Sequence, residues 1–181
     1  QGDALNKIAA EYHDQKFDIV DMSVSQPNVA SLLFKSNEGS FLLGVVAANM
    51  TQSKKIGMIG GMDIPLIRDF FVGFEAGVKW ANTGAEVLPG VYVGAWADPT
   101  KGKELAISLI DSGADIIWPA AGKSGLGALE AAKERGVFGM GVDACQCYLN
   151  DKMLASMTKR VDVAVYETIK ANRLLTSKLD S

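Results

Sequence analysis

The sequence is poor in the residues that most catalytic and metal sites use, with one histidine and two cysteines among 181 residues. His13 lies in the amphipathic segment ALNKIAAEYH, and a single histidine placed there allows no Ser-His-Asp or Cys-His catalytic set. Cys145 and Cys147 are separated by one residue, a spacing at which a disulfide would be strained, and two thiolates do not complete a tetrahedral zinc site. We therefore expect structural thiols, with a metal or redox role as the alternative.

Basic charge and long apolar runs are also scarce. The 18 lysines and arginines are outnumbered by 21 acidic residues, giving a net charge of −3. Such a chain has no basic field for nucleic acid or for an anionic membrane. The longest apolar run, FLLGVVAANM, is far shorter than the roughly 18 residues of a membrane-spanning helix. No signal peptide is recognisable in a chain that opens with Gln1.

Strand-like and helix-like segments alternate along the chain. Runs rich in Ile and Val stand at residues 17–21, 29–34, 55–61, 91–96, 114–118 and 137–143. Between and after them lie segments with helical spacing of apolar residues, at 38–50, 64–82, 98–113, 124–136 and 161–175. This alternation predicts an α/β fold, a Rossmann-like parallel sheet covered by helices on both faces.

Local signals mark where some of these helices begin and how they pack. Asp98 followed by Pro99 predicts a capped helix start, and Asp63 is expected to cap the helix that begins near Ile64. Gly73 and Gly77 share one face of the second long helix. That spacing predicts close packing of this helix on the sheet.

The stretch GKSGLG, residues 122–127, is similar to part of a nucleotide-binding phosphate loop. Gly122, Lys123 and Ser124 match the second half of the pattern, but Ile117 occupies the position of its first glycine. Isoleucine cannot make the tight turn required there. The glycines then either let the backbone approach a ligand or let the helix approach the sheet, and N–H groups at the helix start are candidates for an anion or a hydroxyl.

In parallel sheets ligands bind outside the carboxyl ends of the strands. That rule selects Asp21, residues 60–63, residues 96–98, residues 118–122 and Asp143. Trp118 either stacks on a planar ligand or is packed under a helix. Asp143 either accepts hydrogen bonds from vicinal hydroxyls, as in ribose binding, or caps a turn. Lys159 either brings a cation to the same edge or lies on the surface.

Six segments in order and spacing carry a resemblance that covers nearly the whole chain: LLFKSNEGSFLLGVVAA, KIGMIGGMDIPLIRDFFVGFEAG, YVGAWADPTKGKELA, GADIIWPAAGKSGLG, GVDACQ and SMTKRVDVAVYE. The chain resembles the basic membrane protein family, bacterial solute-binding lipoproteins that include purine-nucleoside receptors of ABC transporters. The resemblance implies a type I periplasmic-binding-protein fold, with ligand held in a cleft between two lobes. It implies no enzyme activity and no cofactor, a transporter permease as partner, and an extracytoplasmic location through a lipid-anchored cysteine that this chain lacks.

The resemblance also implies the binding residues. Asp143 is similar to the family's acceptor of ribose hydroxyls, and Lys159 to a lysine on the sugar side. Gly122 matches the backbone turn at the ligand, and Trp118 stands near an aromatic position where the family usually has phenylalanine. Two further residues are implied, an acidic one from the other lobe and one on the cleft wall: Asp21 and Met62.

Family members are about twice as long as this chain. We therefore expect residues 1–33 to be a remnant of the first lobe, 34–157 to form the second lobe, and 158–181 to be a helix returning to the first. Such a piece is expected to bind a nucleoside weakly and to self-associate through bare apolar surface. The alternatives are a solute-binding or adhesive surface lipoprotein for another ligand, a Rossmann enzyme and the sensing domain of a regulator. The enzyme would need G-x-G-x-x-G where this chain has G-x-x-G-x-G, and the regulator a basic helix-turn-helix.

Overall fold

The computed structural model describes residues 1–177 in two compact units. The smaller unit contains residues 1–34 and the segment that begins at Arg160, and the larger unit contains Lys35–Lys159. Residues 178–181, the end of the expected return helix, lie outside the described residues. The larger unit is therefore one continuous stretch of chain, whereas the smaller one is built from two separate stretches.

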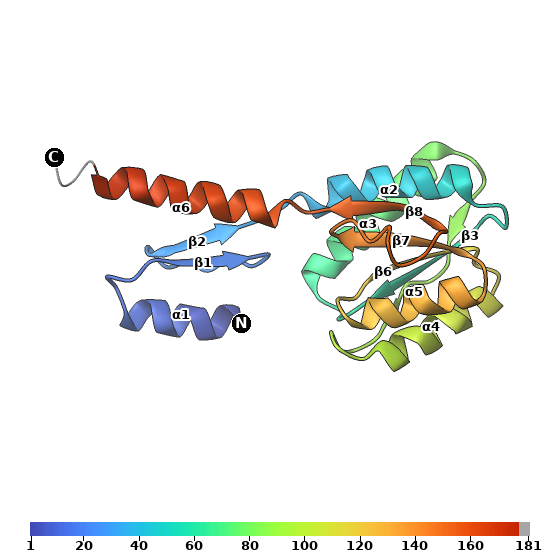
Figure 1. Ribbon diagram of the computed structural model, residues 1–181, viewed down its shortest axis with the longest axis horizontal. Helices are drawn as coiled ribbons and strands as arrows, with labels where there is room; N and C mark the ends of the chain where they lie inside the picture. The colour runs from blue at the N-terminus through green and yellow to red at the C-terminus, as the bar shows by residue number, and fades with distance from the viewer. Residues whose placement is uncertain (178–181) are drawn as a thin grey trace. The chain divides into compact units, whose positions relative to one another are not determined.

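The smaller unit is a two-stranded parallel sheet with a helix on each side (Figure 1). Its elements are α1 (Gly2–Glu11), β1 (Phe17–Val20), β2 (Val29–Leu32) and α6 (Val161–Ser177). Phe17 lies opposite Val29 in the β1–β2 register. The side-chain amide of Asn28 lies within 3.0 Å of the carbonyl oxygens of Ala9, Tyr12 and Gln15. This amide joins the end of α1 to the start of β2.

The larger unit is a parallel sheet in the order β4-β3-β6-β7-β8, with β5 also paired to β3. Its strands are β3 (Lys55–Gly60), β4 (Glu86–Val87), β5 (Val91–Tyr92), β6 (Ile116–Ala120), β7 (Phe138–Asp143) and β8 (Met153–Thr158). Its helices are α2 (Ser36–Met50), α3 (Pro65–Ala81), α4 (Pro99–Asp111) and α5 (Ser124–Glu134). Helices α2 and α3 cover one face of the sheet, and α4 and α5 cover the other (Figure 1). The predicted parallel α/β architecture is confirmed.

Three strands differ from the sequence prediction, and the first of them, the two-residue β4, was not predicted. The run 91–96 forms only the short β5, because Gly94 has φ +83° and turns the chain away from the sheet. Strand β8 was not predicted at all. Its sequence MLASMT has only one β-branched residue, a threonine at its end, and β8 belongs to the sheet through its pairing with β7.

The core has two layers separated by the sheet. On the α2–α3 face, Trp118 packs with Phe70 and Phe74, and its ring is stacked on that of Phe74 with centroids 4.5 Å apart. The neighbouring Ile117 points to the opposite face and joins the cluster under α4 and α5. Because side chains alternate along a strand, two adjacent residues of β6 anchor the two halves of the core.

Glycines bring helices α2 and α3 into backbone contact. A Cβ atom added at Gly73 would overlap the backbone of Asn37, and one at Gly77 would overlap that of Phe41. Gly44 of α2 faces the backbone of Phe74 in the same way. The prediction that Gly73 and Gly77 pack on the sheet is wrong, because these glycines face the neighbouring helix.

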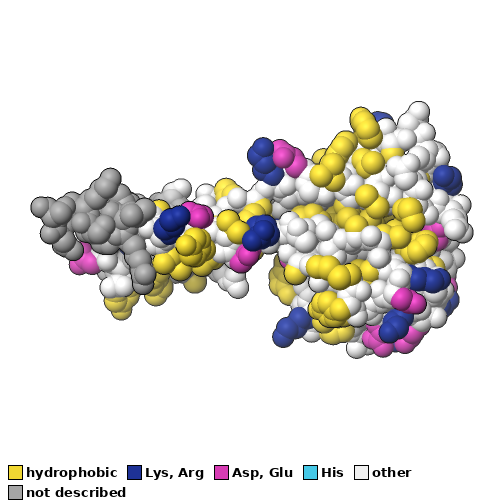
Figure 2. All heavy atoms as spheres, turned by 45° about the horizontal axis from the view of Figure 1, so that its top comes forward, with side chains coloured by type: hydrophobic (Ala, Val, Ile, Leu, Met, Phe, Trp, Pro, Cys, Tyr) yellow, Lys and Arg dark blue, Asp and Glu magenta, His cyan; other side chains and the backbone are white. Residues whose placement is uncertain are grey.

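The outer surface of this helix pair is rich in apolar side chains. Figure 2 shows hydrophobic side chains breaking the polar surface of the larger unit, and those of α2 and α3 that are exposed are Leu42, Val46, Met50, Val72 and Trp80. The ring of Trp80 lies 6.0 Å from that of Phe41 on the adjacent helix. Helix α2 is thus apolar on its outer side as well as on its buried side.

Only one of the two predicted caps is present. The Asp98 carboxylate accepts a hydrogen bond from the Lys101 amide at 2.9 Å, so the cap of α4 is confirmed. The Asp63 cap is wrong, since Ile64 is the N-cap of α3 and has no side-chain hydrogen bond to the helix. The carboxylate of Asp63 instead accepts two hydrogen bonds from Arg68, at 2.7 and 2.9 Å. These hydrogen bonds hold the pKa of Asp63 below its usual value.

At the amino end of β6, Asp115 ties the sheet to the turn before β3. Its carboxylate accepts hydrogen bonds from the Thr51 hydroxyl at 2.6 Å and from the amides of Gln52 and Ser53 at 2.6 and 2.8 Å. Burial by itself would raise the pKa of Asp115, but these hydrogen bonds outweigh it and lower the pKa. The charged carboxylate is therefore the form that holds the turn.

Replacing Gly73 with alanine tests the helix contact. Alanine normally stabilises a helix by about 1 kcal/mol relative to glycine. We expect Gly73→Ala to lower the free energy of unfolding by about 1–3 kcal/mol, because the added methyl overlaps the Asn37 backbone. Urea unfolding followed by circular dichroism measures this, with Val72→Ala on the exposed side of α3 as the control. A stabilised Gly73→Ala protein would contradict the contact.

Asp115→Asn tests whether the charged carboxylate of Asp115 holds the turn before β3. At neutral pH we expect a loss of about 1–3 kcal/mol of unfolding free energy, since hydrogen bonds to a charged group are removed. The pKa of Asp115 is lower in the folded protein than in the unfolded chain, where it is about 3.9. The stability that this difference contributes is therefore complete above the unfolded pKa and is lost as the pH falls through the folded pKa. The difference in unfolding free energy between the wild-type protein and Asp115→Asn should therefore disappear as the pH falls below about 4. Urea titrations across this range measure that difference, and a constant difference would contradict the assignment.

Candidate functional site

The candidate site is the edge of the larger sheet at which its parallel strands end, called here the carboxyl edge. Met62 follows β3, Gly122 follows β6, Asp143 ends β7 and Lys159 follows β8. Because β3, β6, β7 and β8 are neighbours in one parallel sheet, the structure places these four predicted residues along one edge. Asp21 follows β1 in the smaller unit, and Trp118 lies within β6.

Asp143 and Lys159 form an ion pair at this edge. The Lys159 Nζ lies 3.4 Å from an Asp143 carboxylate oxygen, and the Lys159 amide donates to the Asp143 carbonyl at 2.9 Å. The lysine side chain is only 4% exposed, whereas that of the aspartate is 59% exposed. The ammonium also lies 5.1 Å from the centre of the Phe70 ring. A buried cation thus holds a carboxylate that faces outward, where it can accept hydrogen bonds from hydroxyl groups. Lys159 is not the surface lysine of the alternative interpretation.

The backbone of Asp143 is unusual. It has φ +65°, in the left-handed region that residues other than glycine seldom occupy. Asp21, at the end of β1, has φ +63°. Aspartate tolerates this conformation better than most residues, and such conformations concentrate at functional sites. Both aspartates therefore stand at the end of a parallel strand in the same uncommon backbone geometry.

Trp118 does not face a ligand in this structure. It is 0% exposed, stacked on Phe74, and its indole N–H donates to the Gly141 carbonyl at 3.2 Å. The β6–β7 pairing ends at Ile117, and Pro119 has no N–H to continue it. The indole N–H thus has a hydrogen-bond partner inside the core, and core packing, the alternative interpretation, describes this residue. The expectation that Trp118 stacks on a ligand is wrong, because its ring is enclosed in the core.

The aromatic residue at the carboxyl edge is Trp96, which follows β5. Its side chain is 44% exposed, and its ring lies so close to Gly61 that a Cβ there would be 2.5 Å from it. Its carbonyl oxygen lies 3.2 Å from where a Cβ of Gly122 would be. Residues 96–98 were among those selected by the strand-end rule, but no feature of the sequence ranked Trp96 above Trp118. The decisive feature is the turn at Gly94, which carries Trp96 out of the sheet.

The glycine-rich stretch 122–127 binds the neighbouring loop. The Ser124 hydroxyl donates to the Ala95 carbonyl and accepts from the Asp98 amide, both at 2.9 Å, and the Ser124 amide donates to the Trp96 carbonyl at 3.2 Å. A Cβ at Gly127 would overlap the backbone of Pro99. The amides of residues 125 and 126 donate to carbonyls within the same turn. These hydrogen bonds use the amides of residues 124–126, which were among the groups expected to receive an anion, and Gly127 serves helix packing.

The expectation of free cysteine thiols is wrong. Cys145 and Cys147 form a disulfide, with Cα atoms 5.6 Å apart, a separation typical of disulfides. The chain reverses at this point through a hydrogen bond from the Ala144 amide to the Val142 carbonyl at 2.8 Å. Among the described residues no group of three or more histidine, cysteine or acidic side chains is arranged to hold a metal ion.

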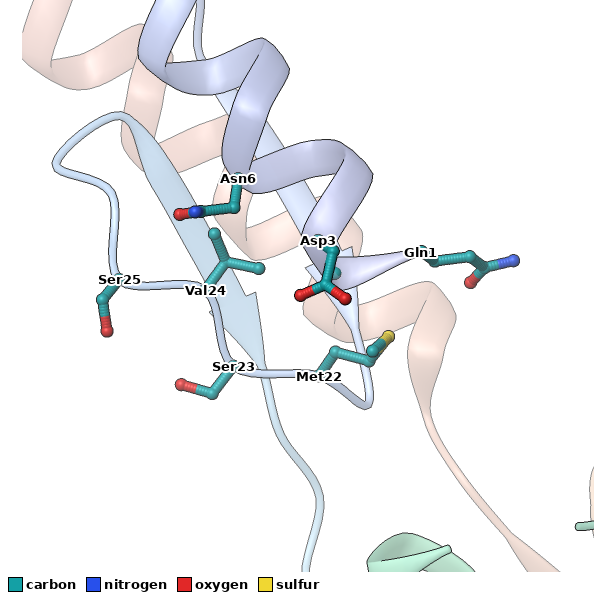
Figure 3. A pocket seen from close by; sticks show the side chains of 8 residues that line it. Gln1, Asp3, Asn6, Met22, Ser23, Val24 and Ser25 are labelled. Carbon is teal, nitrogen blue, oxygen red and sulfur yellow. The ribbon is translucent and has the colours of Figure 1, made fainter.

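A separate cavity of about 230 Å³ lies within the smaller unit (Figure 3). It is lined by the start of α1 and by the segment after β1, with Gln1, Asp3, Asn6 and residues 22–25 around it. The polar side chains on this lining are exposed, and Val24 is the buried apolar residue among them. This cavity gathers no set of buried polar groups comparable to the ion pair at the carboxyl edge.

Comparison with known proteins identifies the class. Residues 1–176 match the family of PnrA-like ABC transporter substrate-binding proteins, Bmp. The chain belongs to this family, which is one of solute-binding proteins. The predicted membership of the basic membrane protein family is thereby confirmed.

Particular relatives are similar over most of the chain. Basic membrane protein A of Borreliella burgdorferi is 35% identical over 185 residues, which cover 98% of this chain and 54% of that protein. A lipoprotein of Pyrococcus horikoshii is 36% identical over 181 residues, covering 92% of this chain and 45% of the relative. This chain thus spans about half the length of such relatives. Within residues 1–177, every helix is too short or too polar to cross a bilayer.

Solved structures confirm the fold class. A solute-binding protein of an ABC transporter system from Aeropyrum pernix matches with a TM-score of 0.85 and 35% identity, over 93% of this chain and 51% of that one. A transcriptional activator of the comK gene from Bacillus halodurans matches with a TM-score of 0.79 and 29% identity, over 98% of this chain and 60% of that one. The fold is the type I periplasmic-binding-protein fold.

Proposed function

We propose that the whole protein containing these residues binds a purine nucleoside in a cleft between its two lobes and delivers it to the permease of an ABC transporter. The observation that carries the proposal is the outward-facing Asp143 carboxylate, held by the buried Lys159 at the carboxyl edge. Family membership supports the transport role, and the name of the Pyrococcus relative supports an extracytoplasmic protein held by a lipid anchor.

In this proposal Asp143 binds the ribose. A carboxylate is an acceptor-only group that can receive one hydrogen bond from each of two vicinal hydroxyls. The Lys159 ammonium holds the Asp143 carboxylate in place, and hydrogen bonds to a charged acceptor are stronger than neutral ones. Asp21, in the same backbone geometry at the end of β1, is proposed as the acidic contribution of the other lobe.

The base is proposed to stack on Trp96. An indole face that is partly exposed at the carboxyl edge can contribute about 1–3 kcal/mol per stacked base. Trp96 takes the place that the sequence prediction gave to Trp118. Met62, which is half-buried beside Gly61, and the exposed backbone of Gly122 complete the proposed lining.

The proposal is tested by calorimetric titration of inosine, guanosine and adenosine into the whole protein. We expect one of them to bind, and Asp143→Asn to weaken binding about 10- to 100-fold, because hydrogen bonds to a charged acceptor are lost. Asp111→Asn is the matched control. Its carboxylate is also 59% exposed and paired, here with Arg135 at 3.0 Å, but it lies at the end of α4.

Two outcomes would contradict parts of this proposal. If no nucleoside binds the whole protein, the ligand is of another class. If binding occurs but Asp143→Asn and Asp111→Asn behave alike, Asp143 does not contact the ribose. Residues 1–181 alone are expected to bind more weakly than the whole protein, because small ligands are usually buried over 70–90% of their surface.

Residues 1–181 produced alone are also proposed to self-associate. The smaller unit has a large share of apolar side chains on its surface, with Ile8, Tyr12, Leu33, Tyr166 and Ile169 between 45% and 63% exposed. Contiguous apolar surface favours association. Sedimentation velocity should show dimers or larger species whose share grows with concentration, and a monomer at all concentrations would contradict this.

A further inference from the structure

The first part of the loop between β7 and β8 is held by Gln146. The Gln146 side-chain oxygen accepts a hydrogen bond from the Val142 backbone amide at 3.0 Å. The backbone amide of Gln146 donates to the Ser156 hydroxyl at 3.1 Å. Its side chain also lies against Gly141, where an added Cβ would be 3.0 Å from the Gln146 Cβ. One residue thus joins two adjacent strands near their ends, at Val142 directly before Asp143 and at Ser156 three residues before Lys159.

The disulfide brackets this residue. Cys145 and Cys147 flank Gln146, and both cysteines are exposed. The stabilisation that a disulfide contributes to a whole fold grows with the length of the loop that it closes, and this one closes around a single residue. Its main effect must therefore be local, on the conformation of the loop. Exposed disulfides are also those that exchange with external thiols.

We propose that Cys145 and Cys147 form a reversible thiol–disulfide site whose reaction partners are external dithiols and their disulfides. The oxidised pair keeps Gln146 in the conformation that joins β7 to β8, and reduction releases it. A metal site is the weaker interpretation of this pair, because no third ligand is grouped with it among the described residues.

The exchange with an external dithiol takes two steps. One thiolate of the external dithiol attacks the Sγ atom of either cysteine, the Sγ–Sγ bond breaks, and the departing cysteine thiolate takes up a proton. The second thiol then attacks the mixed disulfide and releases the other cysteine as a thiol. Two electrons and two protons pass from the dithiol to the pair, and the dithiol leaves as a disulfide.

Reduction is expected to loosen the loop because few other contacts hold it. Next to the disulfide, backbone hydrogen bonds run from Ala144 to Val142 at 2.8 Å and from Leu149 to Gln146 at 3.0 Å, and the others of this loop lie at its far end, at residues 150 and 152. Residues 143–145, 147 and 148 are exposed, so little buried apolar surface opposes the gain in conformational entropy.

Native-state hydrogen exchange on the whole protein tests this, with no ligand present. After reduction with dithiothreitol, the amides of Val142 and Gln146 are expected to exchange about tenfold faster. The amides of Gln52 and Ser53, held by Asp115 at the amino end of β6, should keep their rates. Unchanged exchange at Val142 and Gln146 would overturn the coupling between the disulfide and the loop.

Thiol labelling tests the disulfide itself. In air-oxidised native protein neither cysteine should react with iodoacetamide, and both should react after mild reduction without unfolding. Reoxidation by an oxidised dithiol should remove the reactivity. Labelling of both cysteines before reduction, or of neither after it, would overturn the proposal.

A double variant, Cys145→Ser with Cys147→Ser, separates the disulfide from other effects of dithiothreitol. Its Val142 and Gln146 amides should exchange as in the reduced protein and should not respond to the reductant. A variant that exchanges as slowly as the oxidised protein would show that the disulfide does not hold the loop. These readouts involve no nucleoside, so their failure is distinct from failure of the proposed function.

Discussion

The larger unit depends on the need of a parallel sheet to be buried on both faces. Parallel strands are joined by crossover helices, and these helices must pack over the sheet. In this chain the helices come in two pairs, α2 with α3 and α4 with α5, one pair on each face. Glycines at the contacts, such as Gly73 and Gly127, allow the members of each pair to approach at backbone distance. The same topology brings the carboxyl ends of all the strands to one edge.

That edge is rigid because its loops are joined to one another. Ser124 connects the start of α5 to the loop after β5, and Gln146 connects the ends of β7 and β8. An exposed carboxylate, that of Asp143, is held there by the buried ammonium of Lys159. A binding site requires side chains whose positions are set before the ligand arrives, and these cross-connections supply that constraint.

The sequence was a good guide to what depends on local pattern. The strand and helix order followed from the spacing of apolar residues, and the cap at Asp98 followed from an aspartate before a proline. The strand-end rule also brought Met62, Gly122 and Asp143 to one edge. Strand β8 escaped prediction because MLASMT has almost no β-branched residues, and its state depends on its pairing with β7, the preceding strand.

By itself, the sequence determined the α/β class, the family and the positions of the strand ends, because periodicity and turn residues act over a few neighbours. Only the tertiary structure decided which aromatic faces outward. Trp118 and Trp96 both follow apolar strand-like runs, yet one fills the core and the other lies at the edge. Their difference comes from Phe74 and Gly141, which enclose Trp118, and from the turn at Gly94, which carries Trp96 outward. The burial of Lys159 was equally a matter of long-range packing, since Phe70 and Asp143 come from other strands and helices.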